Sequence, residues 1–397
     1  MKFNRLSQLV LVSAVSLLAA GLVTACGTLT VDFVYVTSAV AAGPNSYGEV
    51  DVFEVNSESG MMRQIPTSPF PSGGRNPVAE ATSTDATTLY VVNQDDNTIV
   101  QFTIGNDGKI YPQNTLNTPG IFPLAVTVAG SNLYVVDTYQ PLPTCSNAAP
   151  CSGSVAAFPI KKDDSLGKPA VNSSLSANYW PLNLPGSSDV LTPTAITTAA
   201  SGAYVYVTAY DAASGLGYVF GFTANSNGTL SALNSGVPFA AGTHPSAIAS
   251  DPGGKYVYVT DFAKTGVLSF QINSGLLTPV SGSPFRSGNG PAAVVVDATG
   301  KFVYVANSQD SNLTAYSAGG GVLKSLGTYT TGTQPVAIGI DPSTNQYLYT
   351  ANFLGNSVSG FMLSATKGTL LNSQNSPYKA NDLPTAVAAI PHGSQKK

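Results

Sequence analysis

An all-β, seven-bladed propeller with four antiparallel strands in each blade is the fold that this 397-residue sequence predicts. Two different motifs each recur seven times, at a spacing of about fifty residues, and a repeat of that length is typical of propellers. The composition agrees, because 39 Gly and 27 Pro residues supply turns while only 10% of the residues are charged. Such a composition suits a chain of many short strands joined by tight turns.

The first motif is a short strand of aromatic and β-branched residues, the types that pack well between sheets. We expect each copy to be the second strand of a blade. Its seven copies begin at Phe33, Leu89, Leu133, Tyr204, Tyr256, Phe302 and Tyr347.

The second motif is a proline followed by small and β-branched residues. Small side chains let neighbouring blades approach one another, so we expect this motif to form the innermost strand, next to the central axis. Residues 251–255 and 297–301 have turn-forming sequences that connect first strands to second strands. The seven copies begin at Pro77, Pro123, Pro193, Pro245, Pro291, Pro335 and Pro384.

The remaining two strands of each repeat follow the aromatic strand. A third strand ends in an aromatic residue, as in 99–102, and a Gly-x-Leu step opens the fourth, as in 368–370. The propeller begins with a second strand at Phe33 and finishes with a first strand over 384–390. We therefore expect the C-terminal strand to complete the first blade, which would leave no open edge in the ring.

The N-terminus predicts export and lipid anchoring. Lys2 and Arg5 precede an apolar run over 9–23, which is the layout of a secretory signal. The run ends at Cys26 in a sequence that resembles the bacterial lipobox, although an ordinary signal followed by a chance cysteine is the alternative. We expect a cleaved signal peptide over 1–25, a lipidated linker over 26–32, the propeller over 33–390 and a polar tail over 391–397. The predicted location is the bacterial cell envelope, with the protein held to the membrane by its lipid.

The other two cysteines fit an exported protein. If Cys26 is lipidated, Cys145 and Cys151 remain to pair as a disulfide across a short loop. We predict no metal site, because the cysteines have no third or fourth ligand nearby. The net charge of −4 offers no basic surplus for phosphates, so we expect no nucleic-acid partner.

The strings at 35–38, 258–261 and 304–307 (YVTS, YVTD and YVAN) resemble YVTN-type repeats. Together with the proline-led strands, they make residues 31–390 similar to the lactonase-like family of seven-bladed propellers, which includes bacterial 6-phosphogluconolactonases. The resemblance implies a His, a carboxylate and Arg residues at the channel mouth. That set cannot be matched residue by residue, and the inner strands carry Ala, Val, Ile and Thr where such enzymes often carry charges.

The loops that enter the inner strands share one face with those that join second to third strands, and we expect the site there. His244 could act as a general base or donate a hydrogen bond to a lactone carbonyl, although it occupies a variable turn position. Arg75 and Arg286 could clamp a carboxylate or phosphate, or could be solvated surface residues. These three are the candidate catalytic residues.

Four further residues near this face are candidates for ligand binding: Trp180, Tyr179, Gln334 and Asp382. Trp180 could stack on a sugar, or it could pack the long excursion over 172–192 onto the rim.

Binding is the function that the sequence favours. The predicted protein is a monomeric, cofactor-free platform that holds a protein, glycan or small molecule at the channel-mouth face. The sequence leaves open whether it is also an enzyme and favours binding without catalysis; if it is an enzyme, we expect a carboxylic-ester (lactone) hydrolase. The alternative is a lactonase that hydrolyses a sugar lactone, and a third possibility is a structural envelope protein. Fold alone does not decide among them.

Overall fold

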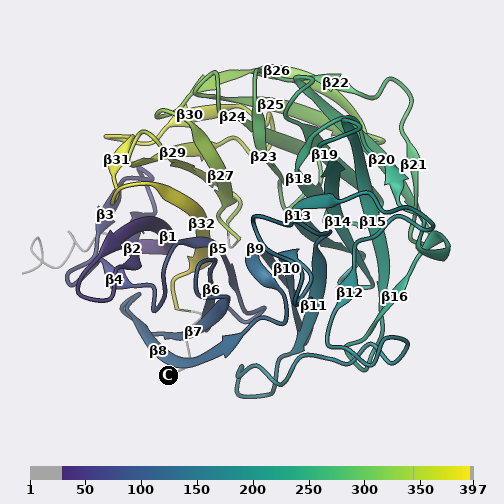
Figure 1. Ribbon diagram of the computed structural model, residues 1–397. Helices are drawn as coiled ribbons and strands as arrows, with labels where there is room; N and C mark the ends of the chain where they lie inside the picture. Colours follow the sequence, from purple (N-terminus) through teal and green to yellow (C-terminus); the bar gives the residue numbers. More distant parts are fainter. Residues whose placement is uncertain (1–28, 343, 394–397) are drawn as a thin grey trace, which may run out of the picture.

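The computed structural model describes residues 29–342 and 344–393. Seven antiparallel sheets form a ring around a central axis, which confirms the predicted propeller (Figure 1). The predicted signal peptide, Cys26 and residues 394–397 of the predicted tail lie outside the described residues. Within the described part of the chain, no helix is both long enough and apolar enough to span a membrane.

Each blade runs outward from an inner strand at the axis. The inner strands are β32 (Pro384–Pro391), β5 (Pro77–Thr82), β9 (Ile121–Ala129), β13 (Leu191–Ala199), β18 (Pro245–Ser250), β23 (Pro291–Val296) and β27 (Pro335–Ile340). The second strands are β1 (Thr30–Ala42), β6 (Thr88–Asn93), β10 (Asn132–Tyr139), β14 (Tyr204–Asp211), β19 (Tyr256–Asp261), β24 (Phe302–Asn307) and β28 (Tyr347–Asn352).

The outer half of each blade is more variable in length. The third strands are β2 (Tyr47–Asn56), β7 (Thr98–Ile104), β11 (Ser154–Pro159), β15 (Leu216–Ala224), β20 (Gly266–Asn273), β25 (Asn312–Gly319) and β29 (Ser357–Leu363). The fourth strands are β3 (Met62–Gln64), β8 (Ile110–Asn117), β12 (Trp180–Pro181), β16 (Leu230–Ala232), β21 (Leu276–Pro279), β26 (Val322–Thr330) and β30 (Leu370–Asn372). Four short strands and one 3-10 turn complete the set: β4 (Phe70–Pro71), β17 (Phe239–Ala240), β22 (Phe285–Arg286), β31 (Tyr378–Lys379) and η1 (Asn234–Gly236).

The C-terminal strand closes the ring. In the first blade β32 pairs with β1, so that Val34 lies opposite Ala389 and Asp32 opposite Pro391. This confirms the predicted closure and extends the strand by one residue beyond the predicted end. The ring consequently leaves no unpaired inner edge between its first and last blades.

Buried tyrosines of the second strands connect neighbouring blades. The hydroxyl of Tyr304 donates a hydrogen bond to the carbonyl of Gly368 in the next blade, at 3.0 Å. Gly368 adopts φ +68, and a Cβ at this position would lie 2.2 Å from the ring of Phe302. Both the backbone conformation and the close approach therefore require glycine, which explains why a Gly-x-Leu step opens the fourth strand.

The core is divided among the blade boundaries, with one cluster of buried apolar residues between each neighbouring pair. The third residue after the repeat proline packs into these clusters in most blades, as Ile196 and Ile248 do. The inner strand thus contributes to stability through its contacts with the neighbouring blade.

Candidate functional site at the mouth of the channel

A repeated backbone hydrogen bond builds one mouth of the channel. In five blades the carbonyl of the residue before the repeat proline accepts a backbone N–H from the end of the second strand, as in His244 with Phe262 at 2.9 Å. The donor directly follows the second strand in four of these blades and lies within the longer β1 in the first blade. The equivalent pairs are Asn76 with Gln94, Gly290 with Ser308, Gln334 with Phe353, and Leu383 with Ala39. Both positions therefore lie at the same end of the blades, next to the inner strands.

His244 lies in an aromatic cluster on this mouth. Its ring centroid is 4.0 Å from that of Tyr210 and 5.7 Å from that of Phe262. In the third blade, Phe122 and Tyr139 form an edge-on pair with centroids 6.1 Å apart. All five side chains are partly exposed, so three consecutive blades present aromatic surface to solvent.

Asp261 holds the turn that carries His244. Its buried carboxylate accepts hydrogen bonds from the Thr243 N–H at 2.8 Å, the Thr243 hydroxyl at 3.0 Å and the His244 N–H at 3.1 Å. A fourth bond comes from the Ala263 N–H at 3.2 Å. These bonds fix the backbone beneath His244 and occupy the carboxylate, so Asp261 serves as a positioning group.

The opposite part of the mouth is polar. Gln334 and Asn76 precede their repeat prolines with φ of +57 and +52, respectively. The Asn76 amide donates to the side chains of Gln94 at 3.2 Å and Asp95 at 3.0 Å. Asp382 is exposed beside Leu383 at the same mouth; ligand binding by Gln334 and Asp382 stays a prediction.

The two candidate arginines do not converge on His244. Arg75 forms an ion pair with Asp96, with Nη2 2.5 Å from Oδ1, and its side chain is 53% exposed. Partial burial of Asp96 would raise the pKa of its carboxyl, but the hydrogen bonds from Arg75 hold that pKa below its usual value. Arg286 lies on β22, which pairs with β20, and two strands separate it from β18. Three strand spacings place it roughly 14 Å from the inner strand of its own blade.

Trp180 and Tyr179 lie away from the mouth. Trp180 forms part of β12, the outermost strand of the third blade, and is only 6% exposed. It packs in the core cluster between the third and fourth blades. The sequence leaves open whether Trp180 stacks on a sugar or packs the long excursion onto the rim, and its burial is that of a packing residue. Trp180 also lies beside a cavity on the outer side of the blades.

Glu80 is the residue that sequence reasoning missed. It is the third residue after Pro77 on β5, so the expectation that the inner strands carry only Ala, Val, Ile and Thr is wrong. The sequence itself distinguishes Glu80, because the residue at this position is aliphatic in the other six repeats. The equivalents are Val126, Ile196, Ile248, Val294, Ile338 and Val387.

The Glu80 carboxyl points toward the first blade. Oε2 accepts a hydrogen bond from the Thr37 hydroxyl, while Oε1 is buried and has no hydrogen-bond partner among the described residues. Burial raises the pKa of Glu80 to about 8, against the opposing hydrogen bonds from Thr37 and the Ala388 N–H. Glu80 is consequently a proton-holding group in the wall of the channel near neutral pH.

A second buried acid lies beneath the mouth in the third blade. Asp137 accepts the Gly120 N–H at 3.1 Å, and burial raises the pKa of its carboxyl to about 7. Cys145 and Cys151 form a disulfide whose loop lies beside this blade, with Asn147 accepting a hydrogen bond from Tyr139 at 3.3 Å. Over the described residues, no three His, Cys, Asp or Glu side chains cluster in a way that could hold a metal ion.

Comparison with known proteins identifies a family for this chain. Residues 33–387 match the family model described as "Lactonase, 7-bladed beta-propeller". The sequence matches no curated protein.

Three solved structures have the same fold. A putative 6-phosphogluconolactonase from Bacteroides fragilis superposes with a TM-score of 0.70 at 18% identity, over 92% of this chain and 99% of that one. The counterpart from Bacteroides uniformis gives 0.69 at 17%, over 91% and 100%. The periplasmic gluconolactonase of Pseudomonas aeruginosa gives 0.69 at 17%, over 91% and 99%. At these identities the likeness concerns the fold.

Proposed function

The chain belongs to the lactonase family of seven-bladed β-propellers, and from this premise we propose that it hydrolyses an unphosphorylated sugar lactone at the channel mouth. The observation that carries the proposal is the position of His244 at the mouth, in tilted contact with the Tyr210 ring and with its backbone fixed by Asp261. The family therefore favours the hydrolytic alternative over the binding platform that the sequence alone favours.

The mouth offers both aromatic and amide groups, which suit the two faces of a sugar ring. The rings of Tyr210, His244 and Phe262 form an apolar surface, on which the C–H face of a sugar lactone can lie. Across the opening, Gln334 and Asn76 offer amide groups that can exchange hydrogen bonds with hydroxyls.

The charges around the mouth favour a lactone without a phosphate. Phosphate is usually held by arginine side chains that are free to bind it bidentately. Here Arg75 is engaged by Asp96, and Arg286 lies far out on its blade. The exposed carboxylate of Asp382 would also repel a phosphate near the mouth.

His244 can supply the base for hydrolysis. The imidazole takes a proton from a water molecule, whose oxygen forms a bond to the lactone carbonyl carbon. The ester bond between that carbon and the ring oxygen then breaks, and the proton passes from the imidazolium to the leaving oxygen. The product is a hydroxy acid, which ionises and releases one proton to solvent.

A test follows proton release from glucono-δ-lactone and from 6-phosphogluconolactone with the full-length protein. We expect the glucono-δ-lactone to react at least tenfold above its spontaneous rate and faster than the phosphorylated lactone. His244→Ala should lower the enzymatic rate by about 100-fold or more. His392→Ala is the matched control, because His392 contacts Phe33 at the end of the last strand and lies outside the mouth. Equal losses in both variants, or no rate above background, would refute the proposal.

A second candidate function is sugar binding without hydrolysis at the same mouth. It is favoured by the four hydrogen bonds that occupy Asp261, since this carboxylate is then not free to orient the His244 ring. Saturable binding of glucono-δ-lactone or gluconate without turnover, measured by calorimetry, would support this candidate over the hydrolase.

We also propose that the protein acts outside the cytoplasm. The Cys145–Cys151 disulfide supports this location, because disulfides persist in oxidising compartments. The expected lipid on Cys26 would hold the propeller at a membrane. Cys26→Ala should move the protein from the membrane fraction to the soluble fraction, and unchanged fractionation would contradict the anchor.

A further inference from the structure

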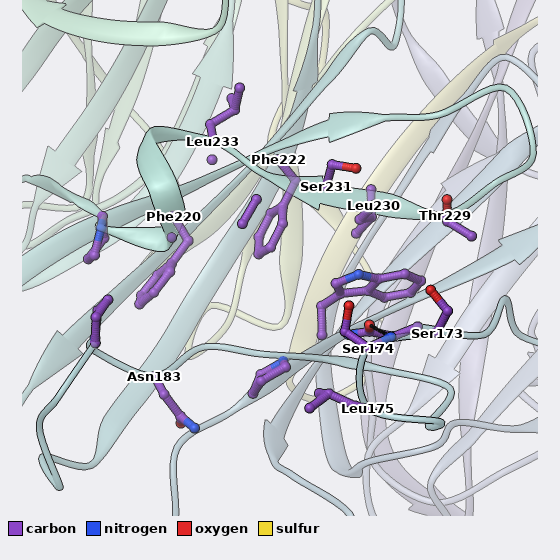
Figure 2. Close-up of a pocket in the computed structure, with 18 of the residues that line it drawn as sticks. Ser173, Ser174, Leu175, Asn183, Phe220, Phe222, Thr229, Leu230, Ser231 and Leu233 are labelled. Atoms are coloured by element: carbon purple, nitrogen blue, oxygen red, sulfur yellow. Dashed lines mark hydrogen bonds between the residues drawn. The ribbon is translucent and has the colours of Figure 1, made fainter.

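A cavity of about 630 Å³ opens on the outer wall of the ring, between the third and fourth blades (Figure 2). One side is formed by residues 171–175, at the start of the long excursion, and by Trp180 and Pro181 of β12. The other side is formed by β15, β16 and the turn around Asn227. The cavity has the size of a small-molecule site, and it shares no residue with the channel mouth.

The floor of the cavity is aromatic and aliphatic. Trp180, Phe220, Phe222 and Leu230 line it, and each is at most 6% exposed. Figure 2 shows Phe220 and Phe222 projecting from β15 toward the excursion. The floor is rigid, because these four residues also belong to the core cluster between the two blades.

The rim of the cavity combines hydroxyl and amide groups with exposed apolar side chains. The polar rim residues are Asn172, Ser173, Ser174, Asn183, Asn227, Thr229 and Ser231. Val171, Leu175 and Val237 also line the cavity, with exposed fractions of 52%, 49% and 49%. Large apolar side chains left this exposed around one concavity are typical of a binding surface.

No residue that lines the cavity is ionisable. A bound phosphate, carboxylate or ammonium group would therefore lose its hydration without gaining a charged partner, which is costly. The site thus selects against charged ligands. A wholly apolar ligand fits poorly as well, since the rim hydroxyl and amide groups that it covered would lose their hydrogen bonds to water.

We propose that this cavity binds a neutral carbohydrate chain. A pyranose ring has an apolar C–H face that matches the floor, and its hydroxyls can both donate to and accept from the serine, threonine and asparagine side chains of the rim. The excursion over 172–177 forms a small hairpin, with the Asn172 N–H donating to the Ala177 carbonyl at 2.7 Å. This hairpin places Ser173 and Ser174 on the ligand side of the cavity (Figure 2).

Trp180 makes the site directly observable, because it is the single tryptophan of the chain. The full-length protein would be titrated with cellohexaose, maltohexaose, mannohexaose and xylohexaose while tryptophan emission is recorded. We expect at least one hexasaccharide to change the emission saturably and to reduce quenching by acrylamide. The acidic hexamer of galacturonic acid should bind at least tenfold more weakly than the best neutral one.

Ala232→Arg tests whether the response comes from this cavity. Ala232 lines the cavity on β16 and is exposed, so an arginine there fills the space without disturbing the core. It should weaken hexasaccharide binding at least tenfold. Ala240→Arg is the matched control, because Ala240 is an exposed alanine on β17 of the same blade that does not line the cavity. Melting temperatures of both variants establish that the fold is kept.

Three outcomes would overturn the proposal. One is the absence of a saturable response to all four neutral hexasaccharides. Another is a response to n-decanol alone, which would assign the cavity to an apolar ligand. The third is equal binding by the Ala232→Arg variant and the control, which would place the carbohydrate elsewhere.

Discussion

The hydroxyl of Thr37 donates a hydrogen bond to Oε2 of Glu80 across the boundary between the first and second blades. Thr37 lies on β1, the strand that also pairs with the C-terminal strand. A buried acid therefore lies at the boundary next to the blade that closes the ring, in the position that holds an aliphatic side chain in every other repeat.

Glu80 makes the stability of the ring depend on pH. Its pKa is about 8 in the folded protein against an ordinary value of 4.5, so its stabilising effect is complete below pH 4.5 and is lost as the pH rises through 8. Glu80→Gln should raise the free energy of unfolding at pH 9 by roughly 3–5 kcal/mol and change it little at pH 4. Urea unfolding at the two pH values measures this, and an equal effect at both would contradict it.

Asp137 makes a second, independent pH-dependent contribution to the free energy of unfolding. Its folded pKa is about 7 against 3.8, so the protonated carboxyl stabilises the protein fully below pH 3.8 and loses this effect through pH 7. Asparagine fills the equivalent position as Asn93, Asn307 and Asn352. Asp137→Asn should therefore stabilise the protein at pH 8 and be nearly neutral at pH 4. Destabilisation at pH 8 would show that the ionised carboxylate is required.

Replacing the Asp261 carboxylate by an amide should destabilise the protein, in contrast to the same change at Asp137. Its carboxylate accepts bonds from three backbone N–H groups and one hydroxyl, and an amide cannot accept all four. Asp261→Asn should lower the free energy of unfolding by about 2 kcal/mol. Because the turn carries His244, the variant should also lose activity toward glucono-δ-lactone. Full activity in a destabilised variant would show that His244 does not depend on this turn.

The Cys145–Cys151 disulfide closes a loop with a sequence separation of six residues. For a loop this short, the chain-entropy model gives a stabilisation of about 2 kcal/mol. Replacing both cysteines by serine should lower the free energy of unfolding by that amount. Reducing agent should lower the free energy of unfolding of the original protein by the same amount and should not change that of the double variant. If reduction also destabilised the double variant, the effect could not be assigned to the disulfide.

Much of the architecture follows from the sequence, because it depends on local patterns. The aromatic strands, the proline-led inner strands and the C-terminal strand each identify their place in a blade, and pairing of β32 with β1 confirms the closure. His244 and Gln334 could also be placed at the mouth, since each precedes a repeat proline.

The sites were harder to predict, because they depend on how irregular loops bring side chains together. That Arg75 is engaged by Asp96 depends on the path of two loops, and the position of Trp180 depends on where a long irregular excursion rejoins the third blade. Glu80 is an exception, because a comparison of the residue at this position in the seven repeats identifies it from the sequence alone.

The pairing of β32 with β1 has a consequence for biogenesis. The last strand of the ring is β32 (Pro384–Pro391), so the first blade stays incomplete until these residues have been synthesised. During translation the second strand of that blade therefore exposes an edge that is prone to aggregation. If the protein is exported as an unfolded chain, in line with the location proposed above, the first and last strands would meet after translocation without this delay.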